Sequence, residues 1–214
     1  GRDVSAALAL PETTPAPAVL LIHEWWGLND QIKTVAREFA NKGFVALAID
    51  LYGGEVATTR ERARELSGSI DGEAATDTLE SWIDWLYAHD KVSGKVGTVG
   101  WCLGGGWSLN AAIARPVDAT VIYYGRVTRP ADDLKALKGP VLGHFATRDK
   151  WINGDMVGSF EAEMDKAGKA DDLTVHWYVA DHAFANPTGN RYDEDDAALS
   201  WERTVAFLTR HLKG

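Results

Sequence analysis

The chain has 214 residues, of which 45% are hydrophobic and 25% are charged, the proportions of an ordinary globular domain. This length is typical of one α/β domain, so we expect residues 1–214 to form a single domain. No apolar run approaches the roughly 18 residues of a membrane span, and a net charge of −9 without any basic stretch argues against nucleic-acid binding.

The cysteine content and the first residues of the chain each lead to a simple expectation. Cys102 is the only cysteine, so an intramolecular disulfide or a cysteine-based metal site cannot form, and we expect no metal site. The chain begins Gly1-Arg2-Asp3 without Met, which predicts a trimmed start. We expect a cytoplasmic protein, although a removed signal peptide is also compatible with this start. The sequence leaves open whether the protein is a monomer or a homodimer.

Short apolar runs alternate with segments of helical period along most of the chain. The strands that we expect are 17–22, 44–49, 95–99, 119–123, 140–145 and 173–179. One helix begins at Asp30, with Gly43 just past its end, and Asp71 is placed to cap a second. Further helices are expected directly after residues 100–105, at 154–167 and at 195–212.

These strands lack polar alternation and are separated by helices, which is typical of a parallel sheet covered on both faces. The sequence therefore predicts an α/β fold, a mostly parallel, doubly wound sheet with helices on both faces. In such folds, sites form at the carboxyl ends of the strands.

A Gly-rich turn at residues 100–105, Gly-Trp-Cys-Leu-Gly-Gly, directly follows one expected strand and precedes a helix. This is the context of the nucleophile elbow G-x-S-x-G, with the sulfur of Cys102 in place of the serine oxygen. A helix N-terminus offers N–H groups to an oxyanion and favours thiolate over thiol. Alternatively, the turn cradles a phosphate or Cys102 is a small buried hydrophobe, but the spacing is not the G-x-G-x-x-G of a dinucleotide turn.

Two further residues follow strands in the order that an activated nucleophile requires. Asp149 comes just after the strand at 140–145, and His182 comes a few residues after the strand at 173–179. The order Cys102, Asp149, His182 is the nucleophile–acid–base order of α/β-hydrolases. Asp181 is a rival for Asp149, but an immediate neighbour seldom has the reach to align the imidazole.

Glu24 ends the first apolar strand, where an ionised side chain is costly unless it is paired. It is either a functional carboxylate or a structural one bonded to a neighbouring loop. The nine tryptophans similarly fit either a large aromatic core or a flat, apolar ligand pocket.

Five segments together point to one family. They are 22–28 (IHEWWGL), 50–52 (DLY), 96–105 (VGTVGWCLGG), 123–125 (YYG) and 182–184 (HAF). Through them, and over nearly its whole length, the chain resembles the dienelactone hydrolase family (carboxymethylenebutenolidases) of the α/β-hydrolase superfamily. The resemblance implies an α/β-hydrolase fold and cleavage of lactones or esters, without a cofactor, by a triad of Cys102, Asp149 and His182.

The same resemblance implies roles for residues around the nucleophile. Glu24 would lie beside the thiol and move on substrate binding so that it helps to remove the sulfhydryl proton. The backbone N–H groups of Trp25 and Leu103 would form the oxyanion hole.

Substrate-binding residues are carried over less completely. The best-known family members hold a substrate carboxylate with two arginines, and Arg64 is the best match for one of them, although it also fits a solvated helix face. The second position, four residues after His182, is Asn186, which cannot replace a bidentate arginine. A less charged ester or lactone is therefore favoured, and the remaining candidate pocket walls are Trp26, Tyr124, Trp151 and Phe184.

We therefore expect a hydrolase of a small ester or lactone that forms a thioester on Cys102. One alternative is a general esterase or thioesterase with no physiological lactone, which Asn186 favours. The other is a non-catalytic relative that binds a ligand or senses redox state through its single thiol.

Overall fold

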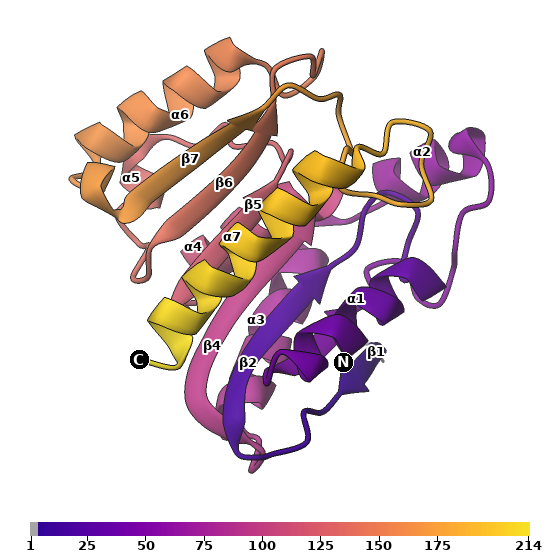
Figure 1. The fold of residues 1–214 in the computed structure, drawn as a ribbon, viewed down its shortest axis with the longest axis vertical. Coiled ribbons are helices and arrows are strands. Elements are labelled where there is room, and N and C mark those ends of the chain that lie inside the picture. Colours follow the sequence, from indigo (N-terminus) through magenta and orange to yellow (C-terminus); the bar gives the residue numbers. More distant parts are fainter. Residues whose placement is uncertain (1–3) are drawn as a thin grey trace.

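The computed structural model describes residues 4–214, so the expectation of a trimmed start at Gly1 lies outside the described residues. A seven-stranded sheet in the order β1-β3-β2-β4-β5-β6-β7 forms the centre of the molecule (Figure 1). Its strands are β1 (Ala6–Ala9), β2 (Ala16–Ile22), β3 (Val45–Ile49), β4 (Val92–Trp101), β5 (Ala119–Tyr123), β6 (Val141–Ala146) and β7 (Leu173–Tyr178). Among the strands of residues 4–214 only β1 pairs antiparallel, so the prediction of a mostly parallel sheet is confirmed.

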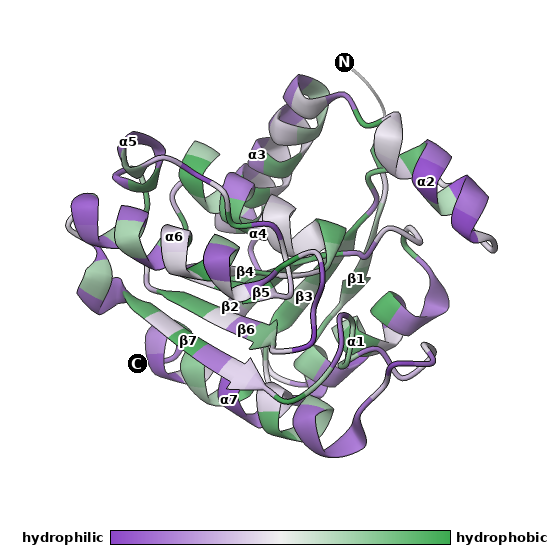
Figure 2. Cartoon of the chain, turned by 90° about the horizontal axis from the view of Figure 1, so that it is seen from above, coloured by the Kyte–Doolittle hydropathy of each residue, from purple (hydrophilic) through white to green (hydrophobic). Residues whose placement is uncertain are grey.

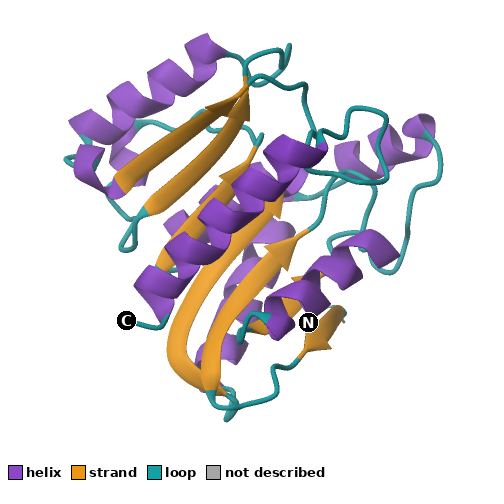
Figure 3. Ribbon diagram, in the orientation of Figure 1, coloured by secondary structure: helices purple, strands orange, loops and turns teal. Residues whose placement is uncertain are grey.

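Helices cover both faces of this sheet, as expected (Figure 3). They are α1 (Asp30–Asn41), α2 (Arg60–Gly68), α3 (Gly72–Ala88), α4 (Leu103–Ala114), α5 (Ala131–Leu134), α6 (Gly154–Lys166) and α7 (Glu194–Leu212), with a 3₁₀ turn at Ala170–Asp172. One apolar cluster joins the sheet to α3, α4 and α6, and a second joins it to α1 and α7. Figure 2 shows these two layers on either side of the strands.

Side-chain caps explain where several of these helices begin. The side chains of Asn29, Asp71, Asn153 and Asp193 each accept a hydrogen bond from a backbone N–H three residues later. These caps satisfy N–H groups that have no partner within the helix. The expected cap at Asp71 is confirmed. None of the helices within residues 4–214 is long and apolar enough to cross a membrane.

The structure adds the edge strand β1 and the short helix α5 to the expected elements, and it lengthens the strand β4. The strand β1 was not expected, because its four residues (Ala-Ala-Leu-Ala) show no period and it lies at the sheet edge. The strand β4 is longer than expected at both ends, since Val92 pairs with Ala16 and Trp101 pairs with Tyr123. This longer β4 carries the chain straight into the Gly-rich turn.

The topology places one group of loops together. Because β2, β4, β5, β6 and β7 are parallel, their carboxyl ends meet at one edge of the sheet. The residues that follow these ends include Glu24, Cys102, Tyr124, Asp149 and His182. The fold therefore brings all of the predicted chemical groups to one side of the molecule.

Candidate active site

The turn at residues 100–105 has the geometry of a nucleophile elbow. Cys102 lies between β4 and α4 with φ 54° and ψ −114°, a backbone conformation that residues other than glycine rarely adopt. A Cβ on Gly100 would lie 1.9 Å from the Gly104 carbonyl oxygen, and one on Gly104 would lie 2.1 Å from the Ile22 carbonyl oxygen. The turn is therefore closed so tightly that both positions require glycine.

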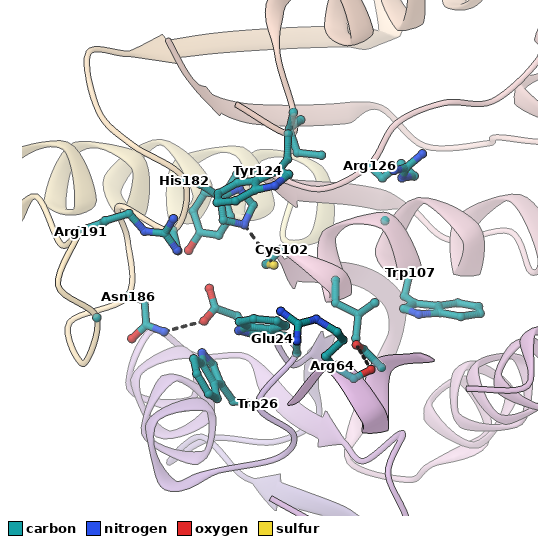
Figure 4. A pocket seen from close by; sticks show the side chains of 18 of the residues that line it. Glu24, Trp26, Arg64, Cys102, Trp107, Tyr124, Arg126, His182, Asn186 and Arg191 are labelled. Atoms are coloured by element: carbon teal, nitrogen blue, oxygen red, sulfur yellow. Dashed lines mark hydrogen bonds between the residues drawn. The ribbon is translucent and has the colours of Figure 1, made fainter. Parts of the chain in front are cut away.

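The Cys102 side chain meets the predicted histidine. The Nε2 atom of His182 lies 3.1 Å from the sulfur of Cys102 (Figure 4). The other ring nitrogen of His182, Nδ1, lies 2.5 Å from Oδ2 of Asp149. Asp181, the rival carboxylate, is exposed. The imidazole thus bridges the thiol and the buried carboxylate, as an activated nucleophile requires.

Asp149 is held by more than the histidine. Its Oδ1 accepts hydrogen bonds from the backbone N–H groups of Trp151 (2.8 Å) and Ile152 (3.0 Å). Burial alone would raise the pKa of Asp149, but the hydrogen bonds from His182 and from these two N–H groups outweigh it, so the pKa is lowered. Asp149 is therefore a carboxylate that orients and attracts the imidazole.

The thiol itself is protonated in this arrangement. Burial raises the pKa of Cys102 to about 12, and the negative charge of Glu24 adds to the rise. The backbone N–H groups of Leu103 and Trp25 lie near the sulfur and lower its pKa, but by less than burial raises it. The N–H of Leu103 at the helix N-terminus favours the thiolate, as expected, but desolvation and Glu24 outweigh this effect.

The two N–H groups at the sulfur come from separate elements. Leu103 is the first residue of α4, and Trp25 follows the end of β2. Two converging donors of this kind can stabilise the oxyanion of a tetrahedral intermediate. They are the two groups from which the resemblance led us to expect an oxyanion hole.

Glu24 is buried beside Cys102 and held by Asn186. The Nδ2 of Asn186 donates to Oε2 of Glu24 at 2.5 Å, while Oδ1 of Asn186 accepts from the N–H (3.0 Å) and Oγ1 (2.7 Å) of Thr188. Burial raises the pKa of Glu24, and the hydrogen bond from Asn186 opposes the rise. The other carboxylate oxygen, Oε1, and the hydroxyl of Tyr124 are buried and have no hydrogen-bond partner within residues 4–214.

A cavity of about 700 Å³ opens over these groups (Figure 4). It contains four of the nine tryptophans, so the aromatic side chains serve the cavity as well as the core. Its aromatic and amide lining residues are Trp25, Trp26, Trp107, Trp151, Tyr124, Asn110, Asn186 and Asn190. Its cationic lining residues are Arg60, Arg64, Arg126, Arg129 and Arg191.

Most of the predicted substrate-binding residues line this cavity, and one does not. Arg64, Trp26, Tyr124 and Trp151 all lie on its wall. Phe184 is fully buried and packs against the rings of Tyr124 and Tyr178 behind the wall, so its expected place in the pocket is corrected. Ala183, with a φ of 66°, lines the cavity in its place, while the apolar ring of Phe184 belongs to the buried cluster beneath α1 and α7.

Several lining residues were not predicted from the sequence. Arg126 and Arg129 belong to the loop after β5, and Trp107 belongs to α4. Arg191 follows His182 in the last long loop, and its guanidinium lies 5.5 Å from the ring centre of Trp151. No local motif marks these four residues: the three arginines reach the cavity where separate loops cross, and Trp107 lies on the side of α4 that faces it. Residues 4–214 contain no group of three or more His, Cys, Asp or Glu that could hold a metal ion.

Comparisons with known proteins agree on one family. The model of the dienelactone hydrolase family matches residues 4–212. A carboxymethylenebutenolidase from Pseudomonas putida is 30% identical, with 97% of this chain and 92% of that protein covered. Protein usf from Aquifex pyrophilus is 33% identical, with 99% of this chain and 95% of that protein covered.

A solved structure shows the same fold. A dienelactone hydrolase-like promiscuous phosphotriesterase from metagenomic libraries superposes with a TM-score of 0.88 at 26% identity, covering 98% of this chain and 93% of that chain. The sheet, the elbow and these relatives lead to one conclusion: the chain belongs to the dienelactone hydrolase family, has the α/β-hydrolase fold, and is a hydrolase of esters or lactones.

Proposed function

We propose that the protein hydrolyses a small lactone or carboxylic ester through a thioester on Cys102, with Asp149 and His182 completing a triad. The observation that carries this proposal is the double contact of His182, 3.1 Å from the sulfur and 2.5 Å from the Asp149 carboxylate. We also propose that the whole chain acts as one domain, because all seven strands belong to one sheet.

Acylation begins with a neutral thiol. Cys102 gives its proton to Nε2 of His182 as the sulfur bonds to the substrate carbonyl carbon, and the carbonyl oxygen becomes an oxyanion. The N–H groups of Trp25 and Leu103 then hydrogen-bond this oxyanion. When the tetrahedral intermediate collapses, the C–O bond breaks and the imidazolium returns its proton to the leaving oxygen. In a lactone this oxygen stays attached to the acyl group, so the ring opens.

Deacylation uses the same groups with water as the nucleophile. His182 removes a proton from water as the water oxygen attacks the thioester carbonyl, and the sulfur leaves and is reprotonated. Asp149 holds the imidazole in position throughout and stabilises the imidazolium that forms twice in each cycle. The products are a carboxylic acid and an alcohol, or a hydroxy acid from a lactone.

Glu24 assists this chemistry by its charge. While ionised it disfavours a free thiolate, as the raised pKa of Cys102 indicates. The same charge attracts the positive charge of His182. Proton transfer from sulfur to imidazole is therefore favoured while the sulfur attacks the substrate. In the resting enzyme, by contrast, the thiolate is disfavoured. This arrangement keeps the nucleophile protonated until a substrate is present, which also argues against a redox sensor, since such sensors use low-pKa thiols.

The test of the triad uses matched carboxylate variants. Cys102→Ala should abolish turnover of p-nitrophenyl acetate in a folded protein. Asp149→Asn should lower kcat by about 10⁴, as in other triads, because the imidazole loses its orienting partner. Asp181→Asn is the control and should change kcat less than about twofold. Undiminished turnover in Cys102→Ala, or a larger loss in Asp181→Asn than in Asp149→Asn, would contradict the proposal.

A second candidate, a general esterase without a physiological lactone, is favoured by Asn186. Both ends of its amide are occupied, by Glu24 and by Thr188, so it offers no charge to a substrate carboxylate. Comparing kcat/KM for a panel of anionic lactones with that for neutral esters separates the two. Clear preference for the lactones would argue against the general esterase.

A further inference from the structure

A group of cationic side chains lines the cavity away from Asn186, the residue at the second position of the family's carboxylate clamp (Figure 4). Arg126 and Arg129 come from the loop between β5 and α5, together with Asn110 and Trp107 from α4. In Figure 4, Arg126 and Trp107 lie on the opposite side of Cys102 from Asn186 and Arg191. The cavity therefore has two ends with different side chains.

The backbone fixes this loop against the helix that begins at the nucleophile. A Cβ on Gly125 would lie 2.4 Å from the carbonyl carbon of Gly105, and one on Gly106 would lie 3.2 Å from the carbonyl oxygen of Arg126. The loop thus rests directly on the first turn of α4. Arg126 is anchored about one helical turn from Cys102.

Arg129 is fixed by its side chain. Its Nε and Nη2 donate to Oδ1 of Asn110, the first of these at 2.8 Å, and its Nη1 donates to the carbonyl oxygen of Thr128 at 2.5 Å. Asn110 lies eight residues after Cys102 along α4, which corresponds to about 12 Å along the helix axis. The acceptor oxygen of Asn110 is used by Arg129, so its amide nitrogen is left to donate.

These two positive charges are not paired with carboxylates, in contrast to those of two other arginines. Arg62 pairs with Glu55 and Glu65, and Arg115 pairs with Asp84. Within residues 4–214, neither Arg126 nor Arg129 has a carboxylate within 4.0 Å.

The protein carries a net charge of −9, so two unpaired arginines at one end of a cavity are unexpected. Burial lowers the pKa of Arg129, the charge of Asp133 opposes this, and the neighbouring charge of Arg126 adds to the lowering. The two guanidinium groups therefore repel each other. A bound anion would relieve this repulsion.

We propose that Arg126 and Arg129, with the Asn110 amide, form a subsite for an anionic group at the far end of the substrate, a carboxylate or a phosphate oxyanion. This rests on the proposed function, because it places that anion roughly 10 Å from the carbonyl attacked by Cys102. Guanidinium groups bind both oxyanions through charge-assisted hydrogen bonds. The substrate is then an ester or lactone that carries its anion on an extended chain, with Trp107 along the apolar part.

The test compares two esters of equal length, p-nitrophenyl octanoate and the p-nitrophenyl monoester of octanedioic acid. The wild-type enzyme should favour the anionic ester by about a hundredfold in kcat/KM. Arg126→Met and Arg129→Met should each lower this ratio about tenfold, one charge-assisted contact each, and the double variant should bring it close to one. Arg129→Lys keeps the charge and should retain most of the preference.

The control removes two charges elsewhere. Arg37 and Arg115 are exposed and do not line the cavity, so Arg37→Met/Arg115→Met should leave the ratio unchanged. A change in this control as large as that in the cavity variant would show a long-range charge effect and overturn the subsite. Because Arg126 is exposed, its single variant tests the proposal even if the Arg129 variants unfold.

Inhibition separates the two anion sources. Octanol, octanoate and octyl phosphate are compared as competitive inhibitors of p-nitrophenyl acetate hydrolysis, and the Arg126→Met variant should weaken inhibition only by the two anions. Tighter inhibition by octanoate assigns a carboxylate, and by octyl phosphate a phosphate oxyanion. Hydrolysis of both esters with no preference for the anionic one overturns the subsite alone. Hydrolysis of neither contradicts the proposed function.

Discussion

Three residues at the site hold a strained backbone. Cys102, Tyr124 and Ala183 are the only non-glycine residues within 4–214 with positive φ, at 54°, 36° and 66°. Such conformations cost about 1–3 kcal/mol each and concentrate at functional sites. Each lies at the candidate active site: Cys102 is at the tip of the elbow, Tyr124 contacts the ring of His182, and Ala183 directly follows His182. The sequence predicted the glycines around Cys102, but no residue type marks Tyr124 or Ala183 as strained.

At the same scale, Asn186 is a positioning residue whose role can be read from a pH profile. Its hydrogen bond lowers the pKa of Glu24 against the effect of burial. In Asn186→Leu the pKa of Glu24 should rise further, so the limb of the kcat/KM profile that reports Glu24 ionisation should move to higher pH, and kcat at neutral pH should fall about tenfold.

The profile of Glu24→Gln provides the control for this prediction. It should lack that limb, because no group titrates at this position. Thr188→Val, which removes only one contact to the Asn186 oxygen, should shift the limb less than Asn186→Leu. A profile of Asn186→Leu that matches the wild type would show that Asn186 does not act through Glu24.

At the scale of the elements, the first turn of α4 lies in close contact with the end of the strand β2. Gly104 allows this approach, because a Cβ there would meet the carbonyl oxygens of Ile22 (2.1 Å) and His23 (2.5 Å), and both belong to rigid backbone. The alternation of strands and helices, the elbow and the ends of most strands were predictable from apolar runs and turn residues. The edge strand β1 and the length of β4 were not, since both depend on pairing with β3 or β2 and β5 rather than on a local pattern.

Replacing Gly104 by alanine should therefore unfold the elbow rather than merely weaken the helix. We expect Gly104→Ala to lower the free energy of unfolding by more than about 4 kcal/mol, the range of severe core changes. Gly158→Ala in α6 is the matched control, because nothing lies within 4 Å of its Cβ position, and it should stabilise the protein by up to about 1 kcal/mol. Urea denaturation measures both. Equal effects of the two substitutions would contradict the close-approach argument.

At the scale of the whole molecule, the charge of the cavity and the burial of histidines are properties that no single sequence motif predicts. The cavity collects five arginines in a chain of net charge −9. In the sequence, Arg126 and Arg129 are ordinary loop arginines, and Arg191 lies in a long polar segment. Their meeting depends on where separate loops cross the edge of the sheet, which local patterns do not contain. Two histidines, His23 after β2 and His144 in β6, are fully buried.

These buried histidines should make the fold sensitive to acid. Nε2 of His23 accepts from the Leu51 N–H at 3.2 Å, and His144 lies between the hydroxyls of Tyr178 (2.8 Å) and Thr204 (2.9 Å). Burial lowers the pKa of both below the ordinary value of 6.5. Below that pH the unfolded chain takes up protons that the folded chain does not, so stability is complete above pH 6.5 and falls as the pH drops.

The contribution of one histidine can be isolated by difference. Each should cost about 1.4 kcal/mol per pH unit below its unfolded pKa. The difference in the free energy of unfolding between the wild type and His144→Gln, measured by urea denaturation, should therefore shrink by about this amount between pH 6 and pH 5. A difference that stays constant over this range would show that His144 has the same pKa in the folded and the unfolded protein.

The most direct test of the account is to find the acyl group on the protein. The enzyme is quenched with acid within its first turnovers of p-nitrophenyl acetate and is then analysed by peptide mass spectrometry. Because Cys102 is the only cysteine, an acetyl thioester can form at this residue alone. We predict one acetyl group on the peptide that contains Cys102, sensitive to hydroxylamine as a thioester is, and none in Cys102→Ala. Rapid turnover with the acetyl group on another residue, or with turnover retained in Cys102→Ala, would contradict it.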